Sequence, residues 1–295
     1  MKKQLEALVS DARELTKRAL AIVPRPADMD WQRYPAAVWR QEPWGGAFVA
    51  HAEIDDISLD DLLRIEDQKA QIDRNTRQFL AGLPANNVLL WGARGTGKSS
   101  LVHGLLNRYR EEGLRLVEVG KEQLAALPEI ATRLRAEPFR FLVFCDDLSF
   151  EADDASYKAL KSALEGSVFR ASANLLIYAT SNRRHLLPEY MSDNVQATHV
   201  QGELHQSEAV EEKISLSDRF GLWLSFYPFK QDAYLEVAEH WVTAMGTSHG
   251  LAEAWNDDAR AEALRWALAR GVRSGRTAQH FARHWVGMHL LTARF

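Results

Sequence analysis

The sequence predicts an α/β fold in which a mainly parallel sheet is covered by helices on both faces. Apolar runs of strand length alternate with longer segments of helical periodicity, and parallel strands need such helical crossovers. The first run leads directly into a glycine-rich loop and a helix start, the order of a strand–loop–helix unit. The expected strands are residues 88–91, 114–119, 139–145, 174–180 and 222–227.

The N-terminal part of the chain, residues 1–54, is expected to form an extension of its own. Residues 1–23 carry apolar side chains at helical spacing and predict an amphipathic helix. Residues 24–50 are rich in Pro, Gly and Trp, which favours a linker or an irregular arm. Burial against the main domain or in a partner interface is expected for Trp31, Trp39 and Trp44.

The expected nucleotide-binding core covers residues 55–228. A Ser58–Asp61 start signal predicts a helix over residues 58–81. Three further helices are expected at 99–110, ended by Gly113, at 121–136, with a restart at Pro128, and at 153–165. Residues 189–213 are polar and acidic, which predicts a long loop.

Residues 229–295 are expected to form a smaller, all-helical C-terminal domain. The periodicity predicts helices at 231–246, 257–270 and 275–290.

Composition narrows the classes of protein that the chain can represent. The net charge of −4 gives no global positive field for nucleic acid, although a local basic face stays open. The single cysteine, Cys145, excludes a disulfide within the chain and favours a reducing compartment. No apolar stretch approaches the roughly 20 residues of a membrane span. We therefore expect a cytoplasmic protein without a membrane partner.

A phosphate-binding loop is the strongest functional signal. Residues 92–99, GARGTGKS, fit the pattern G-x-x-x-x-G-K-[ST] at every specified position. Lys98 is expected to reach the β- and γ-phosphates of a nucleotide, and the Ser99 hydroxyl to hold Mg²⁺. The predicted nucleotide-binding residues of this loop are Gly92, Ala93, Arg94, Gly95, Thr96, Gly97, Lys98, Ser99 and Ser100.

The apolar strand FLVFC ends in two carboxylates about fifty residues after the loop. We expect Asp146 to hold Mg²⁺ through water, together with Ser99. Asp147 is the candidate base for an attacking water, and Glu151 is the alternative.

Three further polar residues have a functional and a structural interpretation. Asn182 could bond the γ-phosphate or the attacking water, or it could cap a following helix. Arg219 suits an arginine finger that acts on a neighbour's nucleotide, or it could pair with Asp218 or another surface acid. Arg276 could reach back to the γ-phosphate from the C-terminal domain, or it could be a solvated arginine in the first turn of a helix.

Taken in this order, the motifs GARGTGKS, FLVFCDD, ATSNR, LSDRFG and SGRTA resemble those of the AAA+ ATPases. Two longer segments, PANNVLLWGARGTGKSSLV and EEKISLSDRFGLWLSFYPF, resemble more closely the sequences of a bacterial family known as domain of unknown function 815. The AAA+ resemblance implies a five-stranded parallel sheet, a helical lid, ATP at the domain junction and assembly into a ring, by analogy of six subunits. It also implies that Ile65, beside Gln68, contributes to the adenine pocket. Asp147 departs from the glutamate that is usual at its position, which puts the rate of turnover in question.

The leading hypothesis is a Mg²⁺-dependent ATPase of the AAA+ type, with Lys98, Asp147, Asn182 and Arg219 as catalytic residues. Hydrolysis would move the lid and remodel or switch an unidentified protein partner. A helper of replication or transposition is the alternative, and it depends on the arginines of residues 260–295. A small-molecule kinase and an ATP-binding scaffold with little turnover also stay open.

Overall fold

The computed structural model describes residues 13–14, 18, 29–42, 45–51, 55–150, 154–165, 173–184, 186, 198–200, 203–205, 216–251 and 253–292. Most of the helix predicted over residues 1–23 lies outside these residues, as do Trp44, Glu151 and most of the loop predicted over 189–213. Within that loop the structure has a two-stranded antiparallel pair, β7 (Thr198–Val200) and β8 (Glu203–His205).

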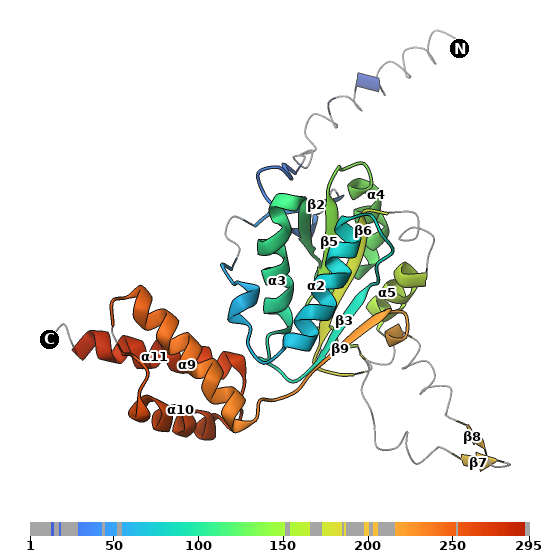
Figure 1. Ribbon diagram of the computed structural model, residues 1–295. Helices are drawn as coiled ribbons and strands as arrows, with labels where there is room; N and C mark the ends of the chain where they lie inside the picture. The colour runs from blue at the N-terminus through green and yellow to red at the C-terminus, as the bar shows by residue number, and fades with distance from the viewer. Residues whose placement is uncertain are drawn as a thin grey trace, which may run out of the picture.

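A single sheet of seven strands forms the centre of the molecule (Figure 1). Its order is β2-β1-β4-β5-β6-β3-β9, and all neighbouring pairs are parallel except the β1–β2 hairpin. The five predicted strands are confirmed, and two further strands lie beyond β4. The strands are β1 (Ala36–Glu42), β2 (Gly45–Ala50), β3 (Val88–Gly92), β4 (Leu114–Glu118), β5 (Arg140–Cys145), β6 (Leu175–Ser181) and β9 (Leu222–Phe226).

The β1–β2 hairpin corrects the expectation of an irregular arm over residues 24–50. Its strand β1 pairs in parallel with β4, so the hairpin extends the sheet. Trp31 and Trp39 are 3% and 0% exposed and pack on this edge of the core. A Cβ atom at Gly46 would overlap the Trp39 ring, so the glycine that resembled a loop signal makes room for a buried tryptophan.

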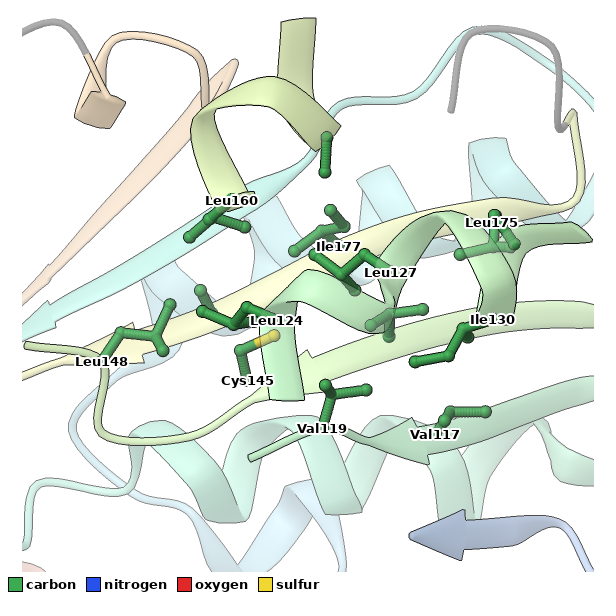
Figure 2. Close-up of a cluster of buried hydrophobic side chains, with 14 of the residues drawn as sticks. Val117, Val119, Leu124, Leu127, Ile130, Cys145, Leu148, Leu160, Leu175 and Ile177 are labelled. Carbon is green, nitrogen blue, oxygen red and sulfur yellow. The ribbon is translucent and has the colours of Figure 1, made fainter. Parts of the chain in front are cut away.

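Helices cover both faces of the sheet, as predicted. The helices α2 (Glu66–Leu80) and α3 (Lys98–Tyr109) bury Ile72, Phe79 and Leu105 on one face. On the other face, η3 (Lys121–Ala126), α4 (Leu127–Leu134) and α5 (Ala155–Glu165) pack on the strands through residues that include Leu127 and Leu160 (Figure 2). Short η2 (Arg110–Glu112) ends at Gly113, which has a φ of 91°.

The helix predicted over residues 58–81 is wrong in its first third. The Ser58–Asp61 capping box starts only a 3₁₀ turn, η1 (Leu59–Asp61). The chain then turns through Arg64, whose φ of 66° is left-handed, and α2 begins at Glu66. A capping box satisfies the first free N–H groups of any helical turn, so it does not determine how long the turn continues.

The C-terminal helices α9 (Gln231–Ser248), α10 (Asp257–Arg270) and α11 (Gly275–Thr292) form a bundle with its own core (Figure 1). Buried alanines of α10 let the helices approach closely, while Phe281 and Trp285 of α11 fill the interior. This bundle is the small all-α lid of the predicted fold class. None of the helices in the described part of the chain is both long and apolar enough to cross a membrane.

Candidate functional site

The glycine-rich loop connects the end of β3 to the start of α3 and lies next to the lid. Gly92 has a φ of 127°, and a Cβ atom there would overlap the backbone of Phe226 on β9. The Ala93 amide donates to the Phe226 carbonyl at 2.9 Å, which fastens the loop to the neighbouring strand. Gly97, with a φ of 99°, starts α3 in a conformation that residues with a Cβ rarely adopt. The pattern of glycines therefore sets the path of the loop.

Lys98 lies at the end of this loop, and the residue as a whole is only 7% exposed. It donates to the carbonyls of Gly92 at 2.9 Å and Ala93 at 2.8 Å, and to Asn182 Oδ1 at 3.2 Å. Burial lowers the pKa of Lys98 to about 8, against the raising effect of Asp146 and Asp147. The group is therefore mostly charged at neutral pH.

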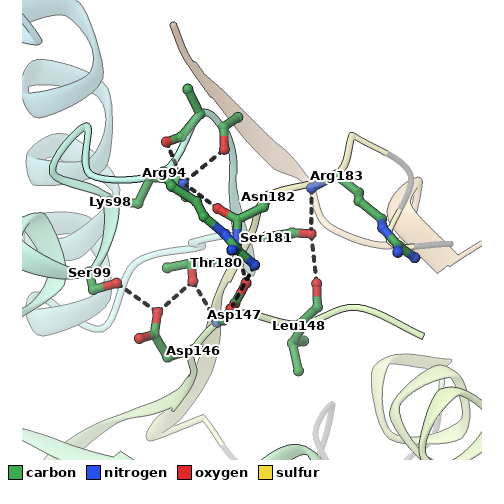
Figure 3. Close-up of polar contacts among 12 residues, drawn as sticks. Arg94, Lys98, Ser99, Asp146, Asp147, Leu148, Thr180, Ser181, Asn182 and Arg183 are labelled. Atoms are coloured by element: carbon green, nitrogen blue, oxygen red, sulfur yellow. Dashed lines mark hydrogen bonds and ion pairs between the residues drawn. The ribbon is translucent and has the colours of Figure 1, made fainter. Parts of the chain in front are cut away.

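Ser99 and Asp146 converge from α3 and the end of β5 (Figure 3). The Ser99 hydroxyl donates to Asp146 Oδ1 at 2.6 Å, and Thr180 Oγ1 donates to the same oxygen at 2.5 Å. A hydroxyl and a carboxylate at the mouth of a phosphate loop are the oxygen donors that Mg²⁺ prefers. The donor set therefore fits a hydrated magnesium ion.

Asp147 extends this network across the site. Its amide donates to Thr180 Oγ1 at 2.8 Å, and its φ of 50° turns the chain sharply after β5. The Asn182 side-chain amide donates to Asp147 Oδ1, and Arg94 Nη2 lies 3.9 Å from Asp147 Oδ2 (Figure 3). Through the carbonyl oxygen of its side chain, Asn182 also accepts from Lys98. Asn182 thus links the lysine to the carboxylate.

The lid touches the phosphate loop directly at the start of α11. The Arg276 amide donates to the Gly95 carbonyl at 3.1 Å. A Cβ atom at Gly95 would lie 2.9 Å from Ser274 Oγ and 3.0 Å from Arg276 Cβ, so this contact needs a glycine. The position of the lid is therefore linked to the conformation of the loop.

A cavity of about 400 Å³ lies between the core and the lid. One end is polar and is lined by the phosphate loop, Asp146, Asp147, Asn182 and Arg276. The other end is largely apolar, although Asp61 and Gln279 also line the cavity. The apolar side chains are Ile57, Leu62, Leu63, Ile65, Phe229, Val237 and Trp241.

Most of the predicted site residues meet at this cavity. Ile65, Arg276 and the loop from Arg94 to Ser100 line it. Gly92 and Ala93 instead hold Lys98 through their carbonyls. Arg219 does not line the cavity: it precedes β9 and pairs with Glu165 of α5, an acid other than the neighbouring Asp218.

Sequence reasoning missed several residues at the apolar end. Trp241 and Val237 come from α9 of the lid, and Leu62 and Leu63 come from the turn that replaces the start of the predicted helix. An apolar residue at helical spacing has the same appearance whether it faces a core or a cavity, so no local signal distinguished them.

The parallel sheet, the glycine-rich loop between β3 and α3 and the helical lid together define a P-loop fold of the AAA+ type. The chain belongs to the family described as "Protein of unknown function (DUF815)", whose model matches residues 32–289.

Solved structures share the fold. A single-residue variant of RuvB from Thermotoga maritima is 18% identical with a TM-score of 0.51, over 78% of this chain and 64% of that one. A second such variant is 18% identical with a TM-score of 0.52, over 80% of this chain and 67% of that one. ORC1 of Aeropyrum pernix, solved in complex with DNA, is 14% identical with a TM-score of 0.53, over 79% of this chain and 61% of that one. The chain thus spans about two thirds or less of these proteins. None of the curated proteins compared with it matches.

Proposed function

We propose that the protein binds MgATP in the cavity between core and lid and hydrolyses it slowly, or on stimulation by a partner. The observation that carries the proposal is the cavity itself, which has a cationic phosphate cradle at one end and an apolar slot at the other. A nucleoside triphosphate matches both ends, because it has an anionic triphosphate chain and a largely apolar base.

The polar end has the features that a triphosphate chain requires. The loop amides and the start of α3 favour anions, because the N–H groups at a helix start have no partners within the helix. Lys98 is charged and can exchange its bonds to loop carbonyls for bonds to phosphate oxygens. Bound Mg²⁺, held by Ser99 and through water by Asp146, would neutralise charge on the β- and γ-phosphates.

The apolar end suits a purine base. Ile65 and Leu62 come from the core, and Trp241 and Phe229 come from the lid segment, so a base between them would contact both domains. Aromatic rings bury large areas at small entropic cost, and they stack on other rings. Nucleotide binding would in this way stabilise one position of the lid.

For hydrolysis, we assign Asp147 as the base and Asn182 as the group that orients the attacking water. Arg219 would act on the nucleotide of a neighbouring copy, within a homo-oligomeric ring. Its place before β9, away from the cavity of its own chain, supports this role. Hydrolysis would then depend on assembly, and lid motion would act on a protein partner.

One observation favours the scaffold alternative with little turnover. The Asp147 carboxylate already accepts from Asn182 and faces Arg94, and aspartate is one methylene shorter than glutamate. If these contacts persist with ATP bound, no base is available to activate water.

Calorimetry with ATP and Mg²⁺, together with phosphate release measured across protein concentration, tests the proposal. We expect binding of ATP and a specific rate that rises with concentration. Binding without phosphate release at any concentration would identify the scaffold, and an absence of binding would reject the nucleotide site.

A further inference from the structure

Arg94 occupies a variable position of the phosphate-loop pattern, and the pattern itself assigns it no task. Its side chain is 77% exposed, yet it reaches across the loop to Asp147, which is 58% exposed, at 3.9 Å. Figure 3 shows the guanidinium directed at the Asp147–Asn182 pair. An exposed pair at this distance contributes little to stability, so the contact is easily exchanged.

The charges around this contact are unbalanced. Arg94 and Arg276 line the cavity with Lys98, and both arginines act to lower the pKa of Lys98. They face two carboxylates, Asp146 and Asp147. The third cation has no matching acid within this group, so the site has room for further negative charge.

The two carboxylates differ in what holds them. Asp146 accepts from Ser99 and Thr180, both neutral hydroxyls, as suits a group that faces a metal ion. Asp147 is the carboxylate that faces Arg94. Arg94 therefore lies beside the residue that we assign as the base, at the end of the cavity where the terminal phosphate would lie.

We propose that Arg94 distinguishes ATP from ADP by exchanging the Asp147 carboxylate for the γ-phosphate. With ADP, or without nucleotide, Arg94 stays beside Asp147. The terminal phosphate carries more charge than a single carboxylate and offers several acceptor oxygens to a guanidinium. It draws Arg94 away, so that Asp147 keeps its contact with Asn182 but loses the one with Arg94 and can take part in hydrolysis. This inference rests on the proposed ATP site.

The test compares the Kd values of an ATP analogue with a β,γ-imido bridge and of ADP, both with Mg²⁺, by calorimetry. Arg94→Gln should weaken binding of the analogue about tenfold, as expected for loss of one charge-assisted contact, and change that of ADP by about twofold or less. Arg184→Gln is the matched control. Arg184 is an exposed arginine near the same end of the sheet, but it lies over the Trp91 ring and does not line the cavity, so neither Kd should change.

Asp147→Asn tests the other half of the exchange. It removes the charge that holds Arg94, so the preference for the analogue over ADP should rise about threefold or more, and Arg94→Gln in this background should abolish the gain. Equal weakening of both nucleotides by Arg94→Gln would show a general attraction for phosphate and overturn the inference, while the ATP site would stand. Failure of the unaltered protein to bind either nucleotide would overturn the proposed function as well.

Discussion

At the scale of a single residue, Lys98 links the proposed nucleotide site to the stability of the fold. A buried ammonium costs free energy, and this cost is the reason for the lowered pKa of about 8. Between that value and the ordinary value of 10.5, the unfolded chain binds more protons than the folded one, so stability rises with pH across this window.

We therefore expect Lys98→Met to abolish ATP binding and to raise the free energy of unfolding at pH 7 by about 1–3 kcal/mol, given 1.36 kcal/mol per pKa unit less the lost hydrogen bonds. The gain over the unaltered protein should fade between pH 8 and 10.5. Urea denaturation at several pH values measures it. A variant that is less stable at every pH would contradict this account of the lysine.

Trp241 is the residue at the apolar end with the most ring surface to offer a base. We expect Trp241→Ala to weaken ATP binding about tenfold and to leave the binding of inorganic tripolyphosphate unchanged, because only the base loses its contact. Competition against a fluorescent ATP analogue measures both ligands.

Trp255→Ala is the control for Trp241, since Trp255 is also a lid tryptophan but lines a different groove. Equal loss for ATP and tripolyphosphate would place Trp241 outside the base site.

At the scale of elements, the core strands and their helices follow from the sequence, because periodicity and strand–helix alternation are local properties. The hairpin does not. Its strands contain arginine, glycine and glutamate, and their pairing depends on β4, which lies more than sixty residues away. The phosphate loop could be predicted from the sequence because binding of phosphate requires particular residue types at fixed spacing. The partner of Arg219 was not, since Glu165 approaches through tertiary packing.

The hairpin gives a prediction of its own. Gly46→Ala places a methyl group into the Trp39 ring, which has no room to move at 0% exposure. We expect a loss of about 1–3 kcal/mol in the free energy of unfolding, as for other overpacked cores.

Gly120→Ala is the matched substitution, because the added atom would meet only Gln123 Oε1 at 4.0 Å. It should change stability by about 0.5 kcal/mol or less. Similar losses for both variants in thermal and urea unfolding would argue against tight packing at the hairpin.

At the scale of the whole molecule, the proposal requires a second copy to complete the site. We expect Arg219→Ala to bind ATP normally and to lose about 10³-fold or more of the assembly-dependent phosphate release. Mixing it with Lys98→Ala should restore part of the activity, since each variant supplies what the other lacks. If the mixture stays inactive while both variants assemble with the unaltered protein, the shared site is wrong.

The hydrogen bond between the Gly95 carbonyl and the Arg276 amide consists of main-chain atoms alone. Any residue except proline can donate this bond from position 276, so a substitution there can change the side chain offered to a nucleotide and still keep the contact between loop and lid. A relative with another residue in place of Arg276 would keep the main-chain hydrogen bond between loop and lid but lose the positive charge of the arginine. The contact between the domains and the chemistry of the site could then evolve independently.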